Sequence, residues 1–308
     1  MSPPRVLLTN DDGPPDPKES PYVLGLYRHL TEQLGWDVKA EWILLDGTPA
    51  TCANVALHNL YAGEIDLVVC ELRYQAPTWV ATPLASPTVT TRSRSNLTFY
   101  VFSAAFAISS GTIGAAMSSS LSKKRAIALS YGTMIHPTPQ AFFEPAHNLA
   151  CRIMKHLWEN WGEDECGLRE GEVDLYSVNI PLIQDILSED GLKICWTHMW
   201  RNSYGRLFKN VASSKVNRTV NPSGPDAIAD SKTEASAPDS EESAELLFKW
   251  SPDMLGLINP SADALPIGSD GWALHQGWVS VTPLRASFGE PHTHRSQDAE
   301  KFVWKMKL

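Results

Sequence analysis

Two adjacent carboxylates follow the first apolar run of the chain. The run occupies residues 6–8, and Asn10, Asp11 and Asp12 come directly after it, ahead of a glycine. Like charges side by side repel each other unless a cation lies between them. Carboxylate oxygens suit Mg²⁺ and Mn²⁺, and such an ion can polarise a phosphoryl oxygen or activate water. Asp11 and Asp12 are therefore candidate metal ligands and catalytic residues.

Two other interpretations of the acidic pair remain open at this point. In the first, the pair holds Mg²⁺ in a phospho-acceptor domain, with Asp46 of "WILLDGTP" as a third acid. The two prolines directly after the turn delay the next helix, and they weigh against such a domain, as does the length of the chain. In the second, Asp11 only caps a turn and Asp12 is solvated.

The elements that must position these residues show an alternating pattern. Apolar runs interpreted as strands lie at 5–9, 42–45, 65–69, 126–130 and 175–178, and helical patterns lie at 21–34, 53–60, 111–121 and 142–161. This alternation predicts an α/β fold, with a Rossmann-like, mainly parallel sheet and helices on both faces. Such sheets carry their sites at the carboxyl ends of the strands, which is where Asp11 and Asp12 fall.

Length and composition limit the class of protein. The chain has 308 residues, of which 43% are hydrophobic, enough for one large core or two smaller ones. It has no apolar run of about 18 residues, so we expect no membrane span. The chain enters its first strand at once, which leaves no room for a signal peptide. Five scattered cysteines favour reduced thiols and a cytoplasmic location.

Most of the negative charge lies in one stretch. The net charge is −9, and the 20 residues from Asp226 to Glu245 contain seven acids and one base. This stretch is rich in Ser, Ala and Pro and lacks aromatic residues, so we expect a disordered acidic loop over about 212–245. The rest of the chain is nearly neutral, so no nucleic-acid surface is expected.

Several sequence motifs carry a resemblance to a known family. In chain order they are "VLLTNDDG", "LLDGTPATCANVALHNLYAGEIDLVV", "ISSGTIGAAM", "AIALSY", "VDLYSVNIPL" and "GWVSVTPL". Over about 1–289 the chain resembles the SurE (survival protein E) family. "SPYVLGLYRHL" and "WTHMWRNSYGRLF" look like its fungal branch, in which the domain often precedes a tubulin-tyrosine-ligase-like region. We expect 290–308 to be a C-terminal tail, without such a region.

The resemblance implies a three-layer α/β/α fold and a metal-dependent phosphomonoesterase, of nucleotidase or acid-phosphatase type. It implies Mg²⁺ or Mn²⁺ as cofactor, a nucleoside monophosphate or related phosphate ester as substrate, and a homodimer. On matching positions the metal ligands are Asp11 and Asp12, and the substrate-binding residues are Asn10, Gly47, Thr48, Ser110, Gly111 and Thr112. A helix that starts with small residues is also an anion site on physical grounds. The alternative is a small-residue helix packed tightly on the sheet.

The chain departs from the family pattern at two places. The family has a strand and a serine-bearing loop before its "GTP" motif, but here only five residues lead from Asp37 to Trp42. The family also has an asparagine-bearing loop after "DLVV", which here is replaced by the aberrant, glycine-free segment 70–107. A shifted reading frame is one interpretation, and Asn96 is the only asparagine in the segment. We therefore expect weak or absent catalysis; the alternative is a non-catalytic SurE-like binding or scaffold protein.

Other polar and aromatic features have a structural interpretation. The helical spacing of Trp158 and Trp161, and the pair Trp196 and Trp200, favour core positions over stacking on a base. The cations at 123–125 are expected to end the helix at 111–121.

Overall fold

The computed structural model of the protein describes residues 2–10, 21–38, 41–74, 110–133, 138–202, 208–210, 248–250, 260–289 and 306. The sheet strands are β1 (Arg5–Asn10), β2 (Asp37–Val38), β3 (Leu67–Tyr74), β4 (Arg125–Thr133), β5 (Leu175–Leu182), β6 (Ile194–Trp196) and β9 (Val279–Leu284). The helices are α1 (Pro21–Arg28), α2 (Pro49–Val55), α4 (Gly111–Leu121), α5 (Phe143–Glu159) and α7 (Asp270–His275). Short π-helical turns extend α1 over His29–Gln33 and α2 over Ala56–Leu60. A separate pair joins β7 (Phe208–Asn210) and β8 (Phe248–Trp250).

The seven strands form one sheet in the order β2-β1-β3-β4-β5-β9-β6. Strands β1 to β5 run parallel, whereas β9 is antiparallel to β5 and β6 is parallel to β9. The mainly parallel sheet and its first strand are therefore confirmed. Because β2 lies on one side of β1 and β3 on the other, the strand order reverses at the pair β1 and β3. In open α/β sheets ligands bind in the crevice at this point.

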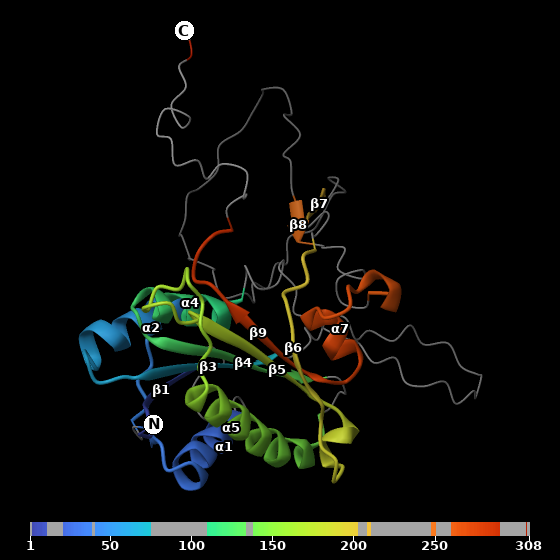
Figure 1. Ribbon diagram of the computed structural model, residues 1–308, viewed down its shortest axis with the longest axis horizontal. Helices are drawn as coiled ribbons and strands as arrows, with labels where there is room; N and C mark the ends of the chain where they lie inside the picture. The colour runs from blue at the N-terminus through green and yellow to red at the C-terminus, as the bar shows by residue number, and fades with distance from the viewer. Residues whose placement is uncertain are drawn as a thin grey trace, which may run out of the picture.

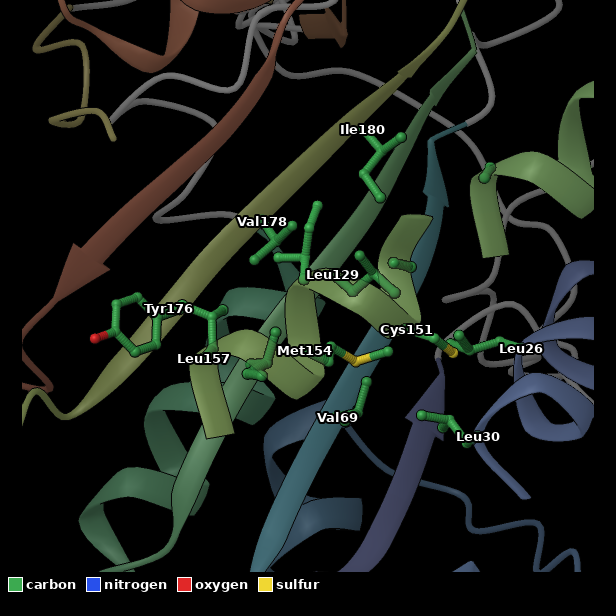
Figure 2. Packing of buried hydrophobic residues seen from close by; sticks show 14 of the residues in the cluster. Leu26, Leu30, Val69, Leu129, Cys151, Met154, Leu157, Tyr176, Val178 and Ile180 are labelled. Atoms are coloured by element: carbon green, nitrogen blue, oxygen red, sulfur yellow. The ribbon is translucent and has the colours of Figure 1, made fainter. Parts of the chain in front are cut away.

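Helices cover both faces of the sheet, with α2 and α4 on one side and α1 and α5 on the other (Figure 1). The strands alternate to match: Leu67 and Val69 of β3 join the core under α1 and α5, and Val68 and Cys70 join the core under α2 and α4. Figure 2 shows the first of these cores, where apolar side chains of α1 and α5 pack against β3, β4 and β5. The apolar runs of β3, β4 and β5 are buried on both faces, as is typical of strands in a parallel sheet.

Helix α4 lies close to the sheet because both surfaces carry small side chains. Its buried Ala115 and Ala116 pack in one cluster with Ala126 and Ala128 of β4. Ser120 Oγ donates to the carbonyl oxygen of Asp174 at 2.9 Å, which fixes the helix to the loop before β5. The expected helix over 111–121 and its close packing are confirmed. This packing fixes the position of the N-terminus of α4 on the sheet.

The expected strand over 42–45 is wrong. Residues 41–45 have no regular structure, and Trp42, Ile43, Leu44 and Leu45 are 39%, 42%, 71% and 38% exposed. The place beside β1 is taken instead by β2, which pairs only with Arg5 and Val6. The apolar run lies beside the rest of β1 without forming a ladder, because apolar composition alone does not set backbone pairing.

Strand β3 is longer than expected. It continues to Tyr74, and its ladder with β4 runs to the same residue. Residues 70–74 therefore belong to the sheet, contrary to the expectation of an aberrant segment from residue 70. Cys70 and Glu71 are buried there. The rest of that segment, the acidic loop at 212–245 and nearly all of the tail at 290–308 lie outside the described residues, and the domain boundaries stay a prediction.

Two expectations about cations and tryptophans need correction. Helix α4 ends at Leu121, and Arg125 is the first residue of β4. Its guanidinium lies 4.9 and 5.0 Å from the ring centres of two tryptophans, and its Nε donates to Glu172 at 3.1 Å. Trp200 is buried as expected, but Trp196 on β6 is 59% exposed. It is exposed because β6 is an edge strand with a neighbour on one side only among the described strands.

The structure also bears on the expectations about cysteines and membrane spans. All five cysteines are free thiols. In the part of the chain that the structure describes, the helices are too short or too polar to cross a membrane.

Candidate functional site at the carboxyl edge of the sheet

The carboxyl ends of β1 and β3 meet at the point where the strand order reverses. Asn10 is the last residue of β1 and is paired in register with Glu71 of β3. Asp11 and Asp12, the candidate metal ligands, follow Asn10 directly in the chain but lie outside the described residues. The expectation that β1 leads to the acidic pair at the carboxyl edge is confirmed as far as Asn10.

Gly47 and Thr48 lie at the start of α2, near the same edge. Gly47 and Asn10 line one pocket, so the structure brings these two predicted residues together. The Thr48 hydroxyl caps α2: its Oγ1 accepts from the Thr51 N–H at 3.2 Å and is 2.9 Å from Thr51 Oγ1. Thr48 therefore has a structural role as the N-cap residue, and its contact with substrate stays a prediction.

The start of α4 offers hydrogen-bond donors. Ser110 is the N-cap residue, and its Oγ accepts from the Ile113 N–H at 3.3 Å. The N–H groups of Gly111 and Thr112 have no acceptor among the described residues. Thr112 is 3% exposed, and its hydroxyl also lacks a partner in that part of the chain. Because α4 connects the parallel strands β3 and β4, these donors lie at the carboxyl edge, where a helix N-terminus favours an anion.

The described residues supply few metal ligands at this edge. Within them, no group of three or more His, Cys, Asp or Glu side chains could hold a metal ion. The oxygen-bearing side chains of this strand pair near the edge include Asn10 at the end of β1 and the buried Glu71 beside it within β3. The described donors thus do not form a metal site, and the proposed site depends on Asp11 and Asp12.

Sequence reasoning missed Glu71 and the polar cluster around it. Burial, and after it the charge of Glu71, raises the pKa of Tyr131 well above its usual value. The Tyr131 hydroxyl is hydrogen-bonded to His147 Nδ1 of α5 at 2.9 Å. Burial, followed by nearby His29, lowers the pKa of His147 to about 3, so the ring is neutral at pH 7. The sequence feature that could have indicated Glu71 is its position as a carboxylate directly after the apolar run 67–70.

Asp270 is another titratable group with a shifted pKa. Asp270 begins α7, and its Oδ1 accepts from the Trp200 and Gly271 N–H groups, both at 2.8 Å. Burial raises the pKa of Asp270 to about 7, although both hydrogen bonds oppose the shift. The carboxyl group joins α7 to the segment after β6, so we assign it a structural role.

Asp270 gives a testable dependence of stability on pH. Between about pH 4 and pH 7 the folded state holds a proton that the unfolded state has lost, so the free energy of unfolding falls as pH rises. The fall is at most about 1.4 kcal/mol per pH unit. Asp270→Asn keeps an oxygen that accepts both hydrogen bonds, and we expect urea unfolding at pH 5, 6, 7 and 8 to show a shallower fall. Parallel pH profiles for the two proteins would exclude this role.

Residues 102–206 match the family model of "Survival protein SurE". A crystal structure of the SurE protein from Aquifex aeolicus is similar to this chain with a TM-score of 0.50, at 18% identity, over 92% of this chain and 94% of that one. The resemblance to the SurE family is confirmed. The part of the chain that matches the family model extends from just before α4 to beyond β6. The structural similarity shows that the SurE fold extends over nearly the whole chain.

A longer yeast protein is also similar to this chain. The "Probable tubulin–tyrosine ligase PBY1" of Saccharomyces cerevisiae is 29% identical over 92% of this chain, in agreement with the fungal branch. The chain spans only 41% of that relative. The alignment has 359 positions, more than the 308 residues of the chain, so the relative has residues at positions where this chain has none.

Proposed function

We propose that this chain is a SurE-type, metal-dependent phosphomonoesterase that acts on nucleoside monophosphates or related phosphate esters. The observation that carries the proposal is the meeting of two features at one edge of the sheet. Asn10 ends β1 where the strand order reverses, and α4 begins at the same edge with two N–H donors that lack an acceptor among the described residues. A phosphate group fits such donors.

The proposal gives each residue a role. Asp11 and Asp12 hold Mg²⁺ or Mn²⁺, with Asn10 beside them, and Gly47 shapes the pocket wall. The cation, when bound, polarises the phosphoryl oxygen and supplies an activated water. The N–H groups of Gly111 and Thr112 hold the phosphate, while Ser110 keeps the first turn of α4 in place.

A non-catalytic phosphate-binding protein is the second candidate. The described segment between β2 and α2 favours it, because residues 41–45 are irregular and contain no serine. The alignment with the yeast relative supports the interpretation that this chain lacks segments that the relative has. Phosphate binding without hydrolysis distinguishes the two candidates, and in both the N-terminus of α4 binds the phosphate.

A substitution at the first position of α4 tests the anion site. Gly111→Pro removes one N–H donor, yet proline is favoured at this position and Ser110 already has an extended backbone with ψ of 122°. We expect the dissociation constant for inorganic phosphate, measured by isothermal titration calorimetry, to rise about tenfold, since hydrogen bonds to charged groups contribute about 1.5–3 kcal/mol.

Gly111→Ala is the matched control, because it keeps the N–H group and adds a side chain at the same position. It should bind phosphate like the unsubstituted protein. Equal affinities for Gly111→Pro and Gly111→Ala would mean that the start of α4 is not the phosphate site.

We also propose a reducing, cytoplasmic location, supported by the five free thiols.

A further inference from the structure

A pocket of about 360 Å³ opens along β1 beside Asn10. It lies between β1, the irregular segment 41–45, and α2 with its π-helical extension. Most of its lining is apolar, and the lining residues that carry the argument are Leu7, Leu8, Trp42, Leu44, Leu45 and Tyr61. The pocket therefore contains the apolar run that the sequence singled out and that the sheet does not use.

The pocket exists because β2 is short. Strand β2 pairs with Arg5 and Val6 only, so no described strand lies beside the following residues of β1 on that side. The segment 41–45 takes this place without forming a ladder. Trp42 packs edge-on against Tyr27 of α1, with ring centres 6.3 Å apart. A second cavity of about 40 Å³ lies between Trp42, Tyr27 and β1, so the indole forms a wall with space around it.

Polar groups in the pocket are few. Asn10 lies at the carboxyl end of β1, where the proposed phosphate site begins. Glu41 is the charged residue of the described lining, which contains no Lys, Arg or His, and Glu41 Oε2 accepts a hydrogen bond from the Tyr61 hydroxyl at 3.2 Å. Ligand pockets of this size, with mostly apolar walls and a few polar groups, fix a ligand by shape and by those groups.

We propose that this pocket holds the organic group of the phosphate ester and selects an aryl group over a nucleoside. The inference rests on the proposed function, because the phosphate at the edge of the sheet is what places the organic group here. An aryl group gains binding free energy in proportion to the apolar surface that it buries. The hydroxyls and ring nitrogens of a nucleoside would lose water, and few polar side chains of the lining, chiefly Thr9, Asn10, Glu41 and Tyr61, could replace it. The Glu41 carboxylate also disfavours a second phosphate.

Isothermal titration calorimetry with four probes tests the inference on the intact chain. The probes are 1-naphthyl phosphate, 1-naphthol, 5′-AMP and inorganic phosphate. We expect 1-naphthyl phosphate to bind about tenfold more tightly than 5′-AMP. We expect 1-naphthol to bind more weakly than its phosphate ester, but measurably. Tighter or equal binding of 5′-AMP would overturn the inference, and so would no binding of either naphthyl probe.

Leu44→Glu tests the position of the organic group. Leu44 is 71% exposed, so a charge there should leave the fold intact while it disfavours an apolar ligand in the pocket. We expect about tenfold weaker binding of 1-naphthol. Ile267→Glu is the matched control, because Ile267 is 82% exposed and lies between β8 and α7, away from the pocket lining. The inference is wrong if both variants bind 1-naphthol like the unsubstituted chain.

The probes separate failure of this inference from failure of the proposed function. If inorganic phosphate does not bind but 1-naphthol binds and Leu44→Glu weakens it, the pocket is confirmed and the phosphomonoesterase proposal fails. If inorganic phosphate binds and 1-naphthol does not, the phosphate site stands and the aryl pocket is excluded.

Discussion

A chain in which segments of the yeast relative replace residues 39–40 and 75–107 is expected to hydrolyse p-nitrophenyl phosphate at least about 100-fold faster than this chain. The assay is the initial rate in Mg²⁺ or Mn²⁺, repeated on nucleoside monophosphates. The physical reason is the coordination shell. Asp11 and Asp12 relieve their mutual repulsion by binding a cation, but two adjacent carboxylates do not fix its place for in-line attack. Neutral oxygens from serine and asparagine would complete the shell without repelling the phosphate.

The controls for this experiment act on the acidic pair itself. Asp11→Asn or Asp12→Asn in the grafted chain should abolish the metal-dependent rate, and a chelator should do the same. Equal rates from this chain and the grafted chain would refute the missing-ligand explanation. Rates indifferent to the chelator and to both substitutions would refute the role of the acidic pair.

Gly25→Ala is expected to destabilise the protein by about 1–3 kcal/mol, although alanine is normally the better helix former. A Cβ atom at Gly25 of α1 would lie 2.5 Å from Nε2 of His147. His147 is 3% exposed and cannot move aside easily, because Tyr131 holds its Nδ1 and the Phe143 ring stacks on it. Urea unfolding monitored by circular dichroism measures the change.

Gly114→Ala in α4 is the matched control, because a Cβ atom there meets no atom within 4 Å. It should stabilise the protein by about 0.5–1 kcal/mol, the usual gain for glycine to alanine inside a helix. Stabilisation by both substitutions would show that α1 and α5 do not pack as closely as described.

The regular part of the fold could be predicted from the sequence because its signals are local. The run at 126–130 is buried on both faces, the run at 5–9 is mostly half-buried, and small residues mark α4, so their identities follow from residue type alone. Asn10 and the start of α4 could be placed at one edge because parallel strands separated by helices leave only that arrangement.

The parts of the fold that could not be predicted depend on pairing between residues distant in sequence, which composition does not reveal. The run 42–45 has the composition of a strand, but the described ladder on that side of β1 is formed by Asp37 and Val38 with Arg5 and Val6. The antiparallel direction of β9 is set by its pairing with β5, about a hundred residues away. Glu71 could not be assigned either, because its burial follows from its place between β1 and β4.

Paramagnetic broadening by Mn²⁺ tests the central claim, that the acidic pair after β1 is part of a metal site, most directly. The backbone amide signal of Asn10 is followed in a deuterated sample as Mn²⁺ is added up to about 1 mM, the range of weak carboxylate sites. We predict early loss of this signal, its recovery on excess Mg²⁺, and no loss in a chain with both Asp11→Asn and Asp12→Asn. An Asn10 signal that Mn²⁺ leaves unchanged, or broadens equally in that variant, would contradict the account.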